Sequence, residues 1–323
     1  MKILLIGPYP PPHGGISTHI AELQRRWVEA GVPCRVLDTG QAGMRFAWRL
    51  LHSALTGWTL HAHTNGHNTK SWLLAGFSGL AGRISGDAVL TLHSGMVPRY
   101  LGDPKRRVGD PPPVLKLSHI LARMVCSSFG RVVCVSEAIR EALEATGVEW
   151  KKLEVRPAFL DVPRSRIPLS PLLQAWMRRH SPVFSAALFF RPEYGFELLA
   201  ASLAKLRRRY PSLGCVVMGS GEQQAAAESL IRTSGLQDTV LLAGDVSHDT
   251  CLAVISRSDM FLRPTLEDGD SVSVREALVL GIPVVASRAG TRPEGVVLFR
   301  TGDERDFCAK VELALKERDH ASA

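Results

Sequence analysis

Two carboxylates, Asp268 and Glu276, flank a predicted helix start near the end of the chain. A helix begins with unpaired backbone N–H groups and the positive end of its dipole, so the loop before it can hold a diphosphate. The two acids are then placed to accept hydrogen bonds from hydroxyl groups on either side of that phosphate. This chemistry suits a sugar nucleotide, with anion-binding residues Gly269, Asp270, Ser271, Val272 and Ser273.

Both acids also have a simpler interpretation. Ser273-Val274-Arg275-Glu276 fits a capping box, in which Glu276 reaches back to the backbone N–H of the cap residue and binds nothing else. Asp268, which precedes a glycine, fits an ordinary turn. The local pattern leaves these alternatives open, and the rest of the chain must decide between them.

The elements that position these residues alternate between strands and helices. Residues 260–262 predict a strand, and residues 274–280 have helical spacing that ends at Gly281 and Pro283. Further apolar runs predict strands at residues 2–6, 34–37, 60–63, 88–92 and 131–135, and again at 184–190, 214–218, 239–242 and 284–286. Helical segments between them indicate an α/β fold with parallel sheets.

The length of 323 residues suits two domains, each with its own core. Prolines are dense between Pro157 and Pro182, and this stretch predicts a linker. We therefore expect an N-terminal domain over residues 1–160 and a C-terminal domain over residues 161–323. A last helix is predicted over roughly 304–317.

Several motifs resemble one enzyme family over essentially the whole chain. Asp268-x7-Glu276, followed by Gly-Ile-Pro-Val-Val-Ala at 281–286, resembles the E-x7-E signature of retaining glycosyltransferase family 4, which has the GT-B fold. The amino terminus agrees, because a first strand leads to a proline run and to His13-Gly14-Gly15. Residues 91–94, 133–137, 217–222 and 244–246 are similar to the family's intermediate landmarks, in the expected order.

The resemblance implies two facing Rossmann-like domains, an acceptor-binding one first and a donor-binding one second, with the last helix crossing back. It implies that His93 and Asp268 face the transferred sugar, that Glu276 binds the ribose, and that amides near Ser271 to Ser273 stabilise the leaving diphosphate. Loop residues that would flank the base of the donor are Gly219, Gly221, Asp245 and Val246. Gly14 and Gly15 would let backbone amides approach a phosphate or an acceptor, although a plain tight turn explains them equally.

The chain departs from the family where an arginine and a lysine usually clamp the donor diphosphate. Phe189 and Tyr194 stand there instead, and Arg191 is the nearest guanidinium able to grip a phosphate. Arg263 and Arg275 are further candidates. The first acid is also Asp268 where the family more often has glutamate.

Histidines raise the question of a metal. His61 and His63 lie on one face of a predicted strand, with His67 and His93 downstream, and imidazoles on one strand face can ligate zinc. His93 ends a predicted parallel strand, where ligands bind in α/β sheets, and the alternative is a hydrogen-bonded polar residue that closes the strand. For these histidines we predict no metal. We also predict no cofactor, since Gly14-Gly15 lacks the G-x-G-x-x-G spacing of NAD enzymes.

The net charge limits the classes of binding partner, and the cysteines indicate where the protein is located. The net charge of +8 favours anionic partners, but the basic runs at 25–26, 105–107, 151–152, 178–179 and 207–209 are scattered and carry no nucleic-acid motif. We expect solvated surface with peripheral contact to an anionic membrane, and no nucleic-acid binding. Six cysteines without paired spacing indicate reduced thiols, and no signal peptide or transmembrane segment is predicted, so we expect a cytoplasmic protein, peripheral on the inner membrane face.

These observations predict a metal-independent, retaining glycosyltransferase that moves a sugar from a UDP- or GDP-type donor to a hydroxyl group of a saccharide or lipid-linked acceptor in surface-glycan assembly. Two alternatives remain. One is a sugar-nucleotide epimerase or a phosphorylase with the same architecture, because fold does not fix chemistry. The other is a degenerate subunit that binds a sugar nucleotide or a partner transferase without turnover, which the missing diphosphate clamp favours.

Overall fold

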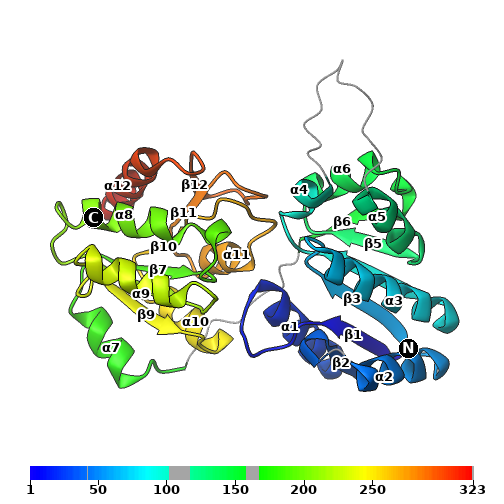
Figure 1. Ribbon diagram of the computed structural model, residues 1–323. Coiled ribbons are helices and arrows are strands. Elements are labelled where there is room, and N and C mark those ends of the chain that lie inside the picture. Colours follow the sequence, from blue (N-terminus) through cyan, green and yellow to red (C-terminus); the bar gives the residue numbers. More distant parts are fainter. Residues whose placement is uncertain (42, 102–116, 158–166, 322–323) are drawn as a thin grey trace, which may run out of the picture. The chain divides into compact units, whose positions relative to one another are not determined.

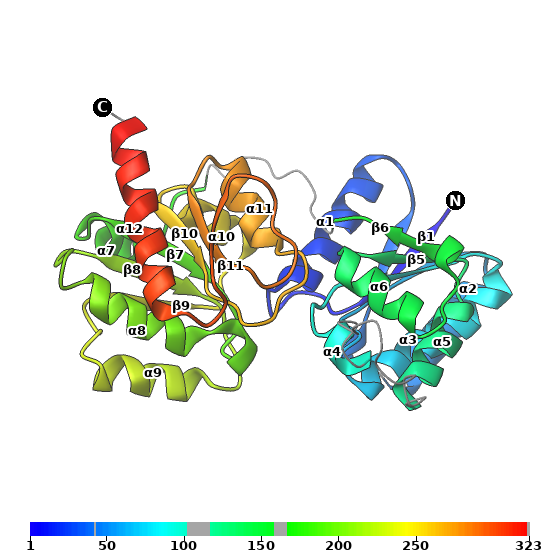
Figure 2. The same cartoon turned by 90° about the horizontal axis from the view of Figure 1, so that it is seen from above.

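A computed structural model describes residues 1–41, 43–101, 117–157 and 167–321 (Figures 1 and 2). The chain divides into two compact units, the first formed by residues 1–10 and 15–160 and the second by residues 11–14 and 161–323. Each unit has one six-stranded parallel sheet with helices packed on it. The expected α/β class with two parallel sheets is therefore confirmed. The predicted domain boundary, Pro163 and the basic run at 105–107 lie outside the described residues.

The sheet of the first unit has the strand order β2-β1-β3-β4-β5-β6. Its strands are β1 (Ile3–Gly7), β2 (Cys34–Asp38), β3 (Thr59–Thr64), β4 (Ala88–Leu92), β5 (Arg131–Cys134) and β6 (Leu153–Val155). The chain runs outward from β1 to β2 and then returns to β3 on the other side of β1. The direction of winding reverses there, and the carboxyl ends of β1 and β3 are where such sheets bind ligands.

Helices connect these strands. They are α1 (Gly15–Glu29), α2 (Met44–Leu55), α3 (Thr69–Ser85), α4 (Val97–Leu101), α5 (Leu117–Ser127) and α6 (Glu137–Ala145). Helix α3 packs on β3 and β4 and contacts both α2 and α5, so these three helices lie side by side (Figure 1). Asn68 begins α3 by accepting a hydrogen bond from the backbone N–H of Ser71, and left-handed Gly86 ends it.

The sheet of the second unit has the strand order β12-β11-β10-β7-β8-β9. Its strands are β7 (Val183–Ala187), β8 (Gly214–Met218), β9 (Val240–Gly244), β10 (Met260–Arg263), β11 (Val284–Ser287) and β12 (Val296–Phe299). The reversal of winding falls between β7 and β10. Along β10, Met260 and Leu262 enter one buried apolar cluster while Phe261 enters another, so both faces of the sheet are covered.

The helices of the second unit are α7 (Pro171–Arg178), α8 (Phe196–Leu206), α9 (Gln224–Thr233), α10 (His248–Ile255), α11 (Val272–Val279) and α12 (Glu304–Ala321). Helix α12 packs against α8, β11 and β12. The prediction that it crosses back to the N-terminal domain stays a prediction. In the described parts of the chain, no helix combines the length and the apolar character that crossing a membrane requires.

Helix α7 corrects the prediction of a linker between Pro157 and Pro182. Ser170 accepts a hydrogen bond from the N–H of Leu173, and Pro171 occupies the first turn, where its missing N–H costs nothing. Leu173 and Trp176 are buried in the core of the second unit. The prolines of this stretch therefore begin a helix and are not all linker.

Candidate functional site

The carboxyl ends of β7 and β10 lead into two loops that touch each other. The backbone N–H of Leu266 donates to the Glu193 carbonyl oxygen over 2.8 Å. Gly195 has a left-handed φ of 69°, and a Cβ on it would overlap the carbonyl oxygen of Pro264. The loop after β7 and the loop after β10 are therefore joined where the winding of the sheet reverses, which is the expected position of a ligand crevice.

Asp268 lies in the second of these loops within a cluster of buried charges. Its Oδ2 accepts from Arg263 Nε over 2.9 Å and lies 3.0 Å from a terminal nitrogen of Arg292. Arg263 also donates to the carbonyl oxygen of Ala187 over 2.6 Å, and the hydroxyl of Thr265 lies 3.2 Å from Asp268 Oδ2. Asp268 therefore anchors the loop to β10 and to the segment after β11, a role that its turn-like sequence does not reveal.

The charges of this cluster set the ionisation of Asp268. Burial alone would raise the pKa of the carboxyl group, but the charges of Arg263 and Arg292 and their hydrogen bonds outweigh it and lower the pKa to about 2. Two guanidinium groups face one carboxylate, so the cluster carries one excess positive charge. Such a charge attracts an anion to this edge of the sheet.

The rest of the loop is held by residues after β11. Thr291 N–H donates to the Gly269 carbonyl oxygen over 2.8 Å, and Gly290 has a left-handed φ of 73° at a place where a Cβ would also overlap that same oxygen. The side chain of Asp270 is almost fully buried and pairs with Arg275 over 2.7 Å. Arg263 and Arg275, candidates for phosphate binding, are thus both engaged by loop aspartates.

Glu276 belongs to α11 and is 3% exposed. Its Oε1 lies 2.6 Å from Nε2 of His248, the first residue of α10. The capping-box interpretation is wrong, because Ser271 and not Ser273 occupies the cap position, and Ser271 makes no side-chain cap hydrogen bond. The carboxylate instead lies one turn inside the helix beside a histidine that sequence reasoning missed.

Gly219 and Gly221 have a structural reason to be glycine. Gly219 has a φ of 129°, and a Cβ on it would overlap the carbonyl oxygen of Leu188. A Cβ on Gly221 would come within 2.6 Å of the backbone nitrogen of Phe190. Both glycines thus let the loop after β8 lie against the loop after β7, whether or not they also contact a base.

Asp245 and Val246 follow β9. The backbone N–H of His13 donates to Asp245 Oδ1 over 2.9 Å within the second unit. Val246 packs partly buried against the apolar core. A Cβ on Gly14 would overlap the ring of Phe189, whereas Gly15 begins α1 with open space around it. Only the first glycine of the pair is therefore required by packing.

Phe189 and Tyr194, which stand where the resemblance predicts a diphosphate clamp, form an aromatic group. The rings of Phe189 and Tyr194 meet edge to face at 5.6 Å, and the Arg263 guanidinium lies 5.3 Å from the Tyr194 ring centre. Arg191 is exposed and lies 3.4 Å from Glu222, which is itself 83% exposed. A surface pair of this kind is weak, so Arg191 can exchange Glu222 for an anionic ligand.

In the first unit, three histidines gather near the carboxyl ends of β1, β3 and β4. His63 Nδ1 lies 3.1 Å from His93 Nε2, and the ring of His19, from α1, lies 5.2 Å from that of His93. Burial first, and the neighbouring histidines second, lower the pKa of His63 and His93 well below the ordinary value. Both rings are therefore neutral at pH 7.

These three side chains are the group that could hold a metal within the part of the chain that the structure describes, since one nitrogen of each lies within 4.8 Å of the others. His61 instead lies 2.8 Å from the hydroxyl of Thr91. The sequence suggested His61, His63, His67 and His93, of which His63 and His93 are in this group, and it missed His19, which comes from a helix more than 40 positions before His63.

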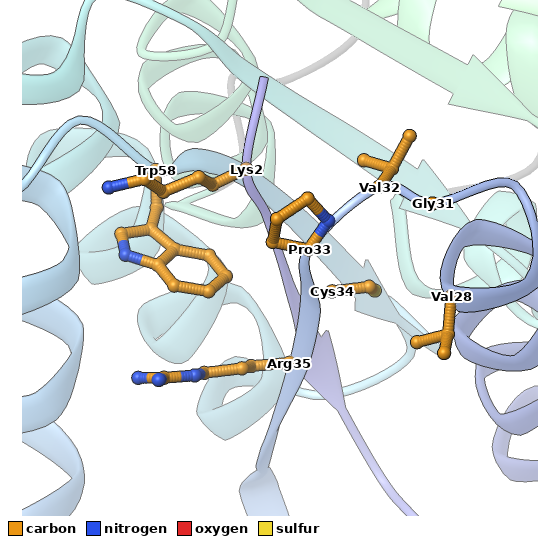
Figure 3. Close-up of a pocket in the computed structure, with 8 residues that line it drawn as sticks. All are labelled: Lys2, Val28, Gly31, Val32, Pro33, Cys34, Arg35 and Trp58. Carbon is orange, nitrogen blue, oxygen red and sulfur yellow. The ribbon is translucent and has the colours of Figure 1, made fainter.

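A shallow pocket lies at the opposite edge of this sheet (Figure 3). Its lining includes Lys2, Cys34 and Trp58, which stand at or just before the amino ends of β1, β2 and β3. Arg35 places its guanidinium 4.9 Å from the Trp58 ring centre. Ligands of parallel sheets bind at carboxyl ends, so this pocket does not mark the catalytic site.

Comparison with known proteins matches each of the two units to a glycosyltransferase sequence profile. Residues 13–164 match the sequence profile described as Glycosyltransferase Family 4, and residues 180–317 match the profile described as Glycosyl transferases group 1. The two profiles together span most of the chain, and residues 165–179 between them follow the break between the units.

Similar proteins include the gpi3 subunit of phosphatidylinositol N-acetylglucosaminyltransferase from Schizosaccharomyces pombe, 24% identical over 88% of this chain and 65% of that protein. A GDP-mannose-dependent phosphatidylinositol monomannoside mannosyltransferase from Mycobacterium tuberculosis is 25% identical over 58% of this chain and 52% of its own. The chain thus spans about half to two thirds of the length of these relatives.

Among solved structures, HepE from Anabaena in complex with UDP and glucose is similar in fold. It has a TM-score of 0.73 and 16% identity, over 99% of this chain and 91% of its own. The GT-B fold expected from the motifs is therefore confirmed.

Proposed function

Because this chain belongs to glycosyltransferase family 4, we propose that it transfers a sugar from a UDP- or GDP-type nucleoside diphosphate donor to a hydroxyl group of an acceptor. The two types of donor reflect the relatives, since one binds UDP and glucose and another depends on GDP-mannose. The acceptor we propose is a saccharide or a lipid-linked saccharide in surface-glycan or glycolipid assembly, used by a peripheral enzyme of the cytoplasmic membrane.

The observation that carries this proposal is the start of α11 beside the reversal of winding in the second sheet. The first backbone N–H groups of α11 open toward the carboxyl edge of the sheet, and buried Glu276 lies one turn further along. Such a helix end holds a diphosphate, and a carboxylate beside it accepts hydrogen bonds from ribose hydroxyls. The donor would therefore bind mainly in the second unit.

The charges nearby suit the departure of a diphosphate. As the bond between the anomeric carbon and the phosphate oxygen breaks, negative charge grows on the leaving group. The α11 N–H groups and the excess positive charge of Arg263, Asp268 and Arg292 would stabilise it. Since these groups can supply that stabilisation themselves, we propose a metal-independent reaction that retains the anomeric configuration.

The acceptor would bind in the first unit, near the histidines at the carboxyl edge of its sheet. His93 is neutral at pH 7, because burial lowers its pKa well below the ordinary value. A neutral imidazole can exchange hydrogen bonds with sugar hydroxyls but adds no charge. We therefore assign His93 to positioning of the transferred sugar and not to acid catalysis.

The test is a screen of the purified protein against UDP-, GDP-, ADP- and TDP-sugars, in which thermal stabilisation and nucleotide release are both measured. Glu276→Gln keeps the size of the side chain but removes its charge and replaces one accepting oxygen with an NH2 donor, and Glu29→Gln, at an exposed pair with Arg25, is the matched control. We expect one donor to stabilise the protein, and its slow turnover to fall about 100-fold or more in Glu276→Gln alone. Turnover unchanged in Glu276→Gln would refute the site.

The products of the same reactions test the finer proposals. Nuclear magnetic resonance of the new glycosidic bond should show the anomeric configuration of the donor, and an inverted product would exclude retention. Turnover should persist after prolonged chelation with EDTA, whereas a loss that Mg²⁺ or Mn²⁺ restores would exclude metal independence.

A second candidate is a subunit that binds the donor without turnover. It is favoured by Asp268, whose carboxylate is taken up by two arginines, and by Phe189 and Tyr194 in place of a charged clamp. Donor binding by the unchanged protein, lost in Glu276→Gln, together with no nucleotide release under any acceptor condition, would establish this candidate instead.

A further inference from the structure

The outer faces of α2, α3 and α5 carry an unusual concentration of apolar side chains. We call the exposed residues of these three helices the α2–α3–α5 face. Of 18 large hydrophobic residues that are exposed in the described chain, 11 lie on it: Met44, Trp48, Leu51, Leu55, Leu73, Phe77, Leu80, Ile84, Leu117, Ile120 and Met124. The other seven are spread over the rest of both units. Exposed apolar patches of this extent mark interaction sites.

Spacing places these residues in stripes along each helix. On α3, Leu73, Phe77, Leu80 and Ile84 recur every three or four positions, which puts them on one side of the helix. The exposed apolar residues of α2 and α5 follow the same spacing. Because α3 packs against both α2 and α5, the three helices that carry these stripes lie side by side (Figure 1).

Helix α3 has the reverse of the usual distribution of side-chain sizes. Its buried side is lined largely by small residues, and Cβ atoms on Gly79 and Gly82 would overlap Ser128 and Ala88. Its large apolar residues point outward instead, with Leu73 and Leu80 both more than half exposed. A helix in contact only with water gains by burying its large side chains, so this arrangement fits an apolar environment outside the protein.

The charged residues of the same face have a single sign. The sequences of α2, α3 and α5 contain Arg45, Arg49, Lys70, Arg83 and Arg123, and no aspartate or glutamate. On α3 the two basic residues stand near the two ends of the apolar stripe. Long basic side chains at the rim of an apolar surface reach lipid headgroups while their stems remain in apolar contact.

We propose that the α2–α3–α5 face docks the protein on an anionic lipid bilayer, with its apolar stripes in the acyl–headgroup boundary and its basic residues on lipid phosphates. Charge decides between this partner and a second copy of the chain. A symmetric dimer would bring the same basic residues of both copies together, which costs free energy, whereas anionic lipid is complementary to them. The proposal concerns binding alone and does not rest on sugar transfer.

Sedimentation with lipid vesicles tests the proposal on the full chain. Vesicles of phosphatidylcholine, alone or mixed with phosphatidylglycerol, are compared at low and high salt. We expect binding to the anionic vesicles at least about tenfold tighter than to the neutral ones, and weaker in high salt. Equal binding to both vesicles, or none to either, would overturn the proposal.

Two pairs of variants locate the surface. Leu73→Ser with Leu80→Ser removes apolar residues from the face, and Leu172→Ser with Leu313→Ser removes exposed leucines of the second unit as the control. Arg45→Glu with Arg49→Glu reverses charge on the face, and Arg178→Glu with Arg179→Glu is its control. Each face variant should weaken binding about tenfold or more, and each control should bind like the unchanged protein.

Two further measurements keep the outcome decisive. Thermal unfolding of every variant shows whether it still folds. If a face variant does not fold, Trp48→Phe, which keeps an aromatic ring on the face, is measured in its place. Brominated lipids quench the fluorescence of tryptophans that enter the bilayer, so vesicles that contain them should quench Trp48. The fraction of fluorescence that these vesicles quench should therefore be smaller in Trp48→Phe than in the unchanged protein. Sedimentation velocity without lipid should show a monomer, and a dimer that the face variants dissociate would assign the surface to a second copy.

Discussion

Nε2 of His248 lies 2.6 Å from Oε1 of Glu276, so a carboxylate that is almost fully buried has one oxygen held by a neighbouring helix. Because the carboxylate is planar, that contact also fixes the direction in which its other oxygen points. If Glu276 binds the donor ribose, His248 is a positioning residue for it. Glu276 and His248 are 28 positions apart, and their contact depends on α10 and α11 packing together.

We therefore predict that His248→Ala weakens donor binding about tenfold and that His248→Gln, which can still donate a hydrogen bond, restores much of it. Isothermal titration with the donor identified above measures both. His320→Ala, at the exposed end of α12, should bind like the unchanged protein. Equal affinities in the alanine and glutamine variants would show that the hydrogen bond has no role in binding.

Asp268 separates two buried guanidinium groups, so its loss should be costly. Asp268→Asn leaves Arg263 and Arg292 without their shared carboxylate, and breaking a buried ion pair of this kind costs about 3–5 kcal/mol. Glu222→Gln, at an exposed pair, should change the unfolding free energy by less than about 1 kcal/mol. Urea unfolding followed by circular dichroism compares them, and similar values for both would contradict the cluster's structural role.

The buried histidines predict a dependence of stability on pH. The pKa values of His63 and His93 are lowered by burial, so below about pH 6.5 the unfolded chain takes up protons that the folded chain does not. Stability is then fully present above that pH and is lost as the pH falls. Each histidine should contribute about 1–2 kcal/mol to the loss between pH 7 and pH 5.

Tryptophan fluorescence during urea unfolding measures this dependence, because five of the six tryptophans belong to the first unit. His63→Gln should reduce the difference in stability between pH 7 and pH 5, whatever its effect at either pH alone. His52→Gln, at an exposed position on α2, should leave the difference as it is. A His63→Gln protein with the original difference would show that this histidine titrates alike in both states.

The glycines of the loop after β8 predict a stability effect that is separate from ligand binding. Gly219→Ala forces a Cβ against the Leu188 carbonyl at a φ of 129°, and we expect a loss of about 2 kcal/mol or more. Gly15→Ala meets open space at a helix start and should change stability by about 0.5 kcal/mol or less. Thermal unfolding without ligand gives both values, and a Gly219→Ala protein as stable as Gly15→Ala would contradict the described packing.

Local sequence patterns predicted most of the fold. All ten predicted strands are present. Central strands such as β1 and β8 gave the strongest signal, because each is an apolar run buried on both faces of a parallel sheet. The two strands that were missed, β6 and β12, are short and only partly buried. Glu154 interrupts the apolar pattern of β6, whereas β12 is an apolar run of four residues that the sequence analysis did not assign to a strand. Helix α7 was missed because prolines that begin a helix resemble prolines of a linker.

The site was less predictable than the fold. The spacing of Asp268 and Glu276 located the loop and the helix that follows it, since both residues belong to one strand–loop–helix segment. Their partners Arg292 and His248 come from other segments, and no local spacing relates them to the acids. Ion pairs between loops depend on which strands become neighbours, and that information is not contained in any single stretch of sequence.

The pairing of β7 with β10 also constrains when the second unit can fold. Ser185 of β7 lies in register with Phe261 of β10, so two adjacent central strands are separated by more than 70 positions of chain. During synthesis from the amino terminus, β7, β8 and β9 must wait for β10 to leave the ribosome before the sheet can close. Contacts of such long range slow folding and leave strand edges exposed meanwhile. The loops around Glu193 and Asp268 can therefore come into contact only late in the synthesis of the protein.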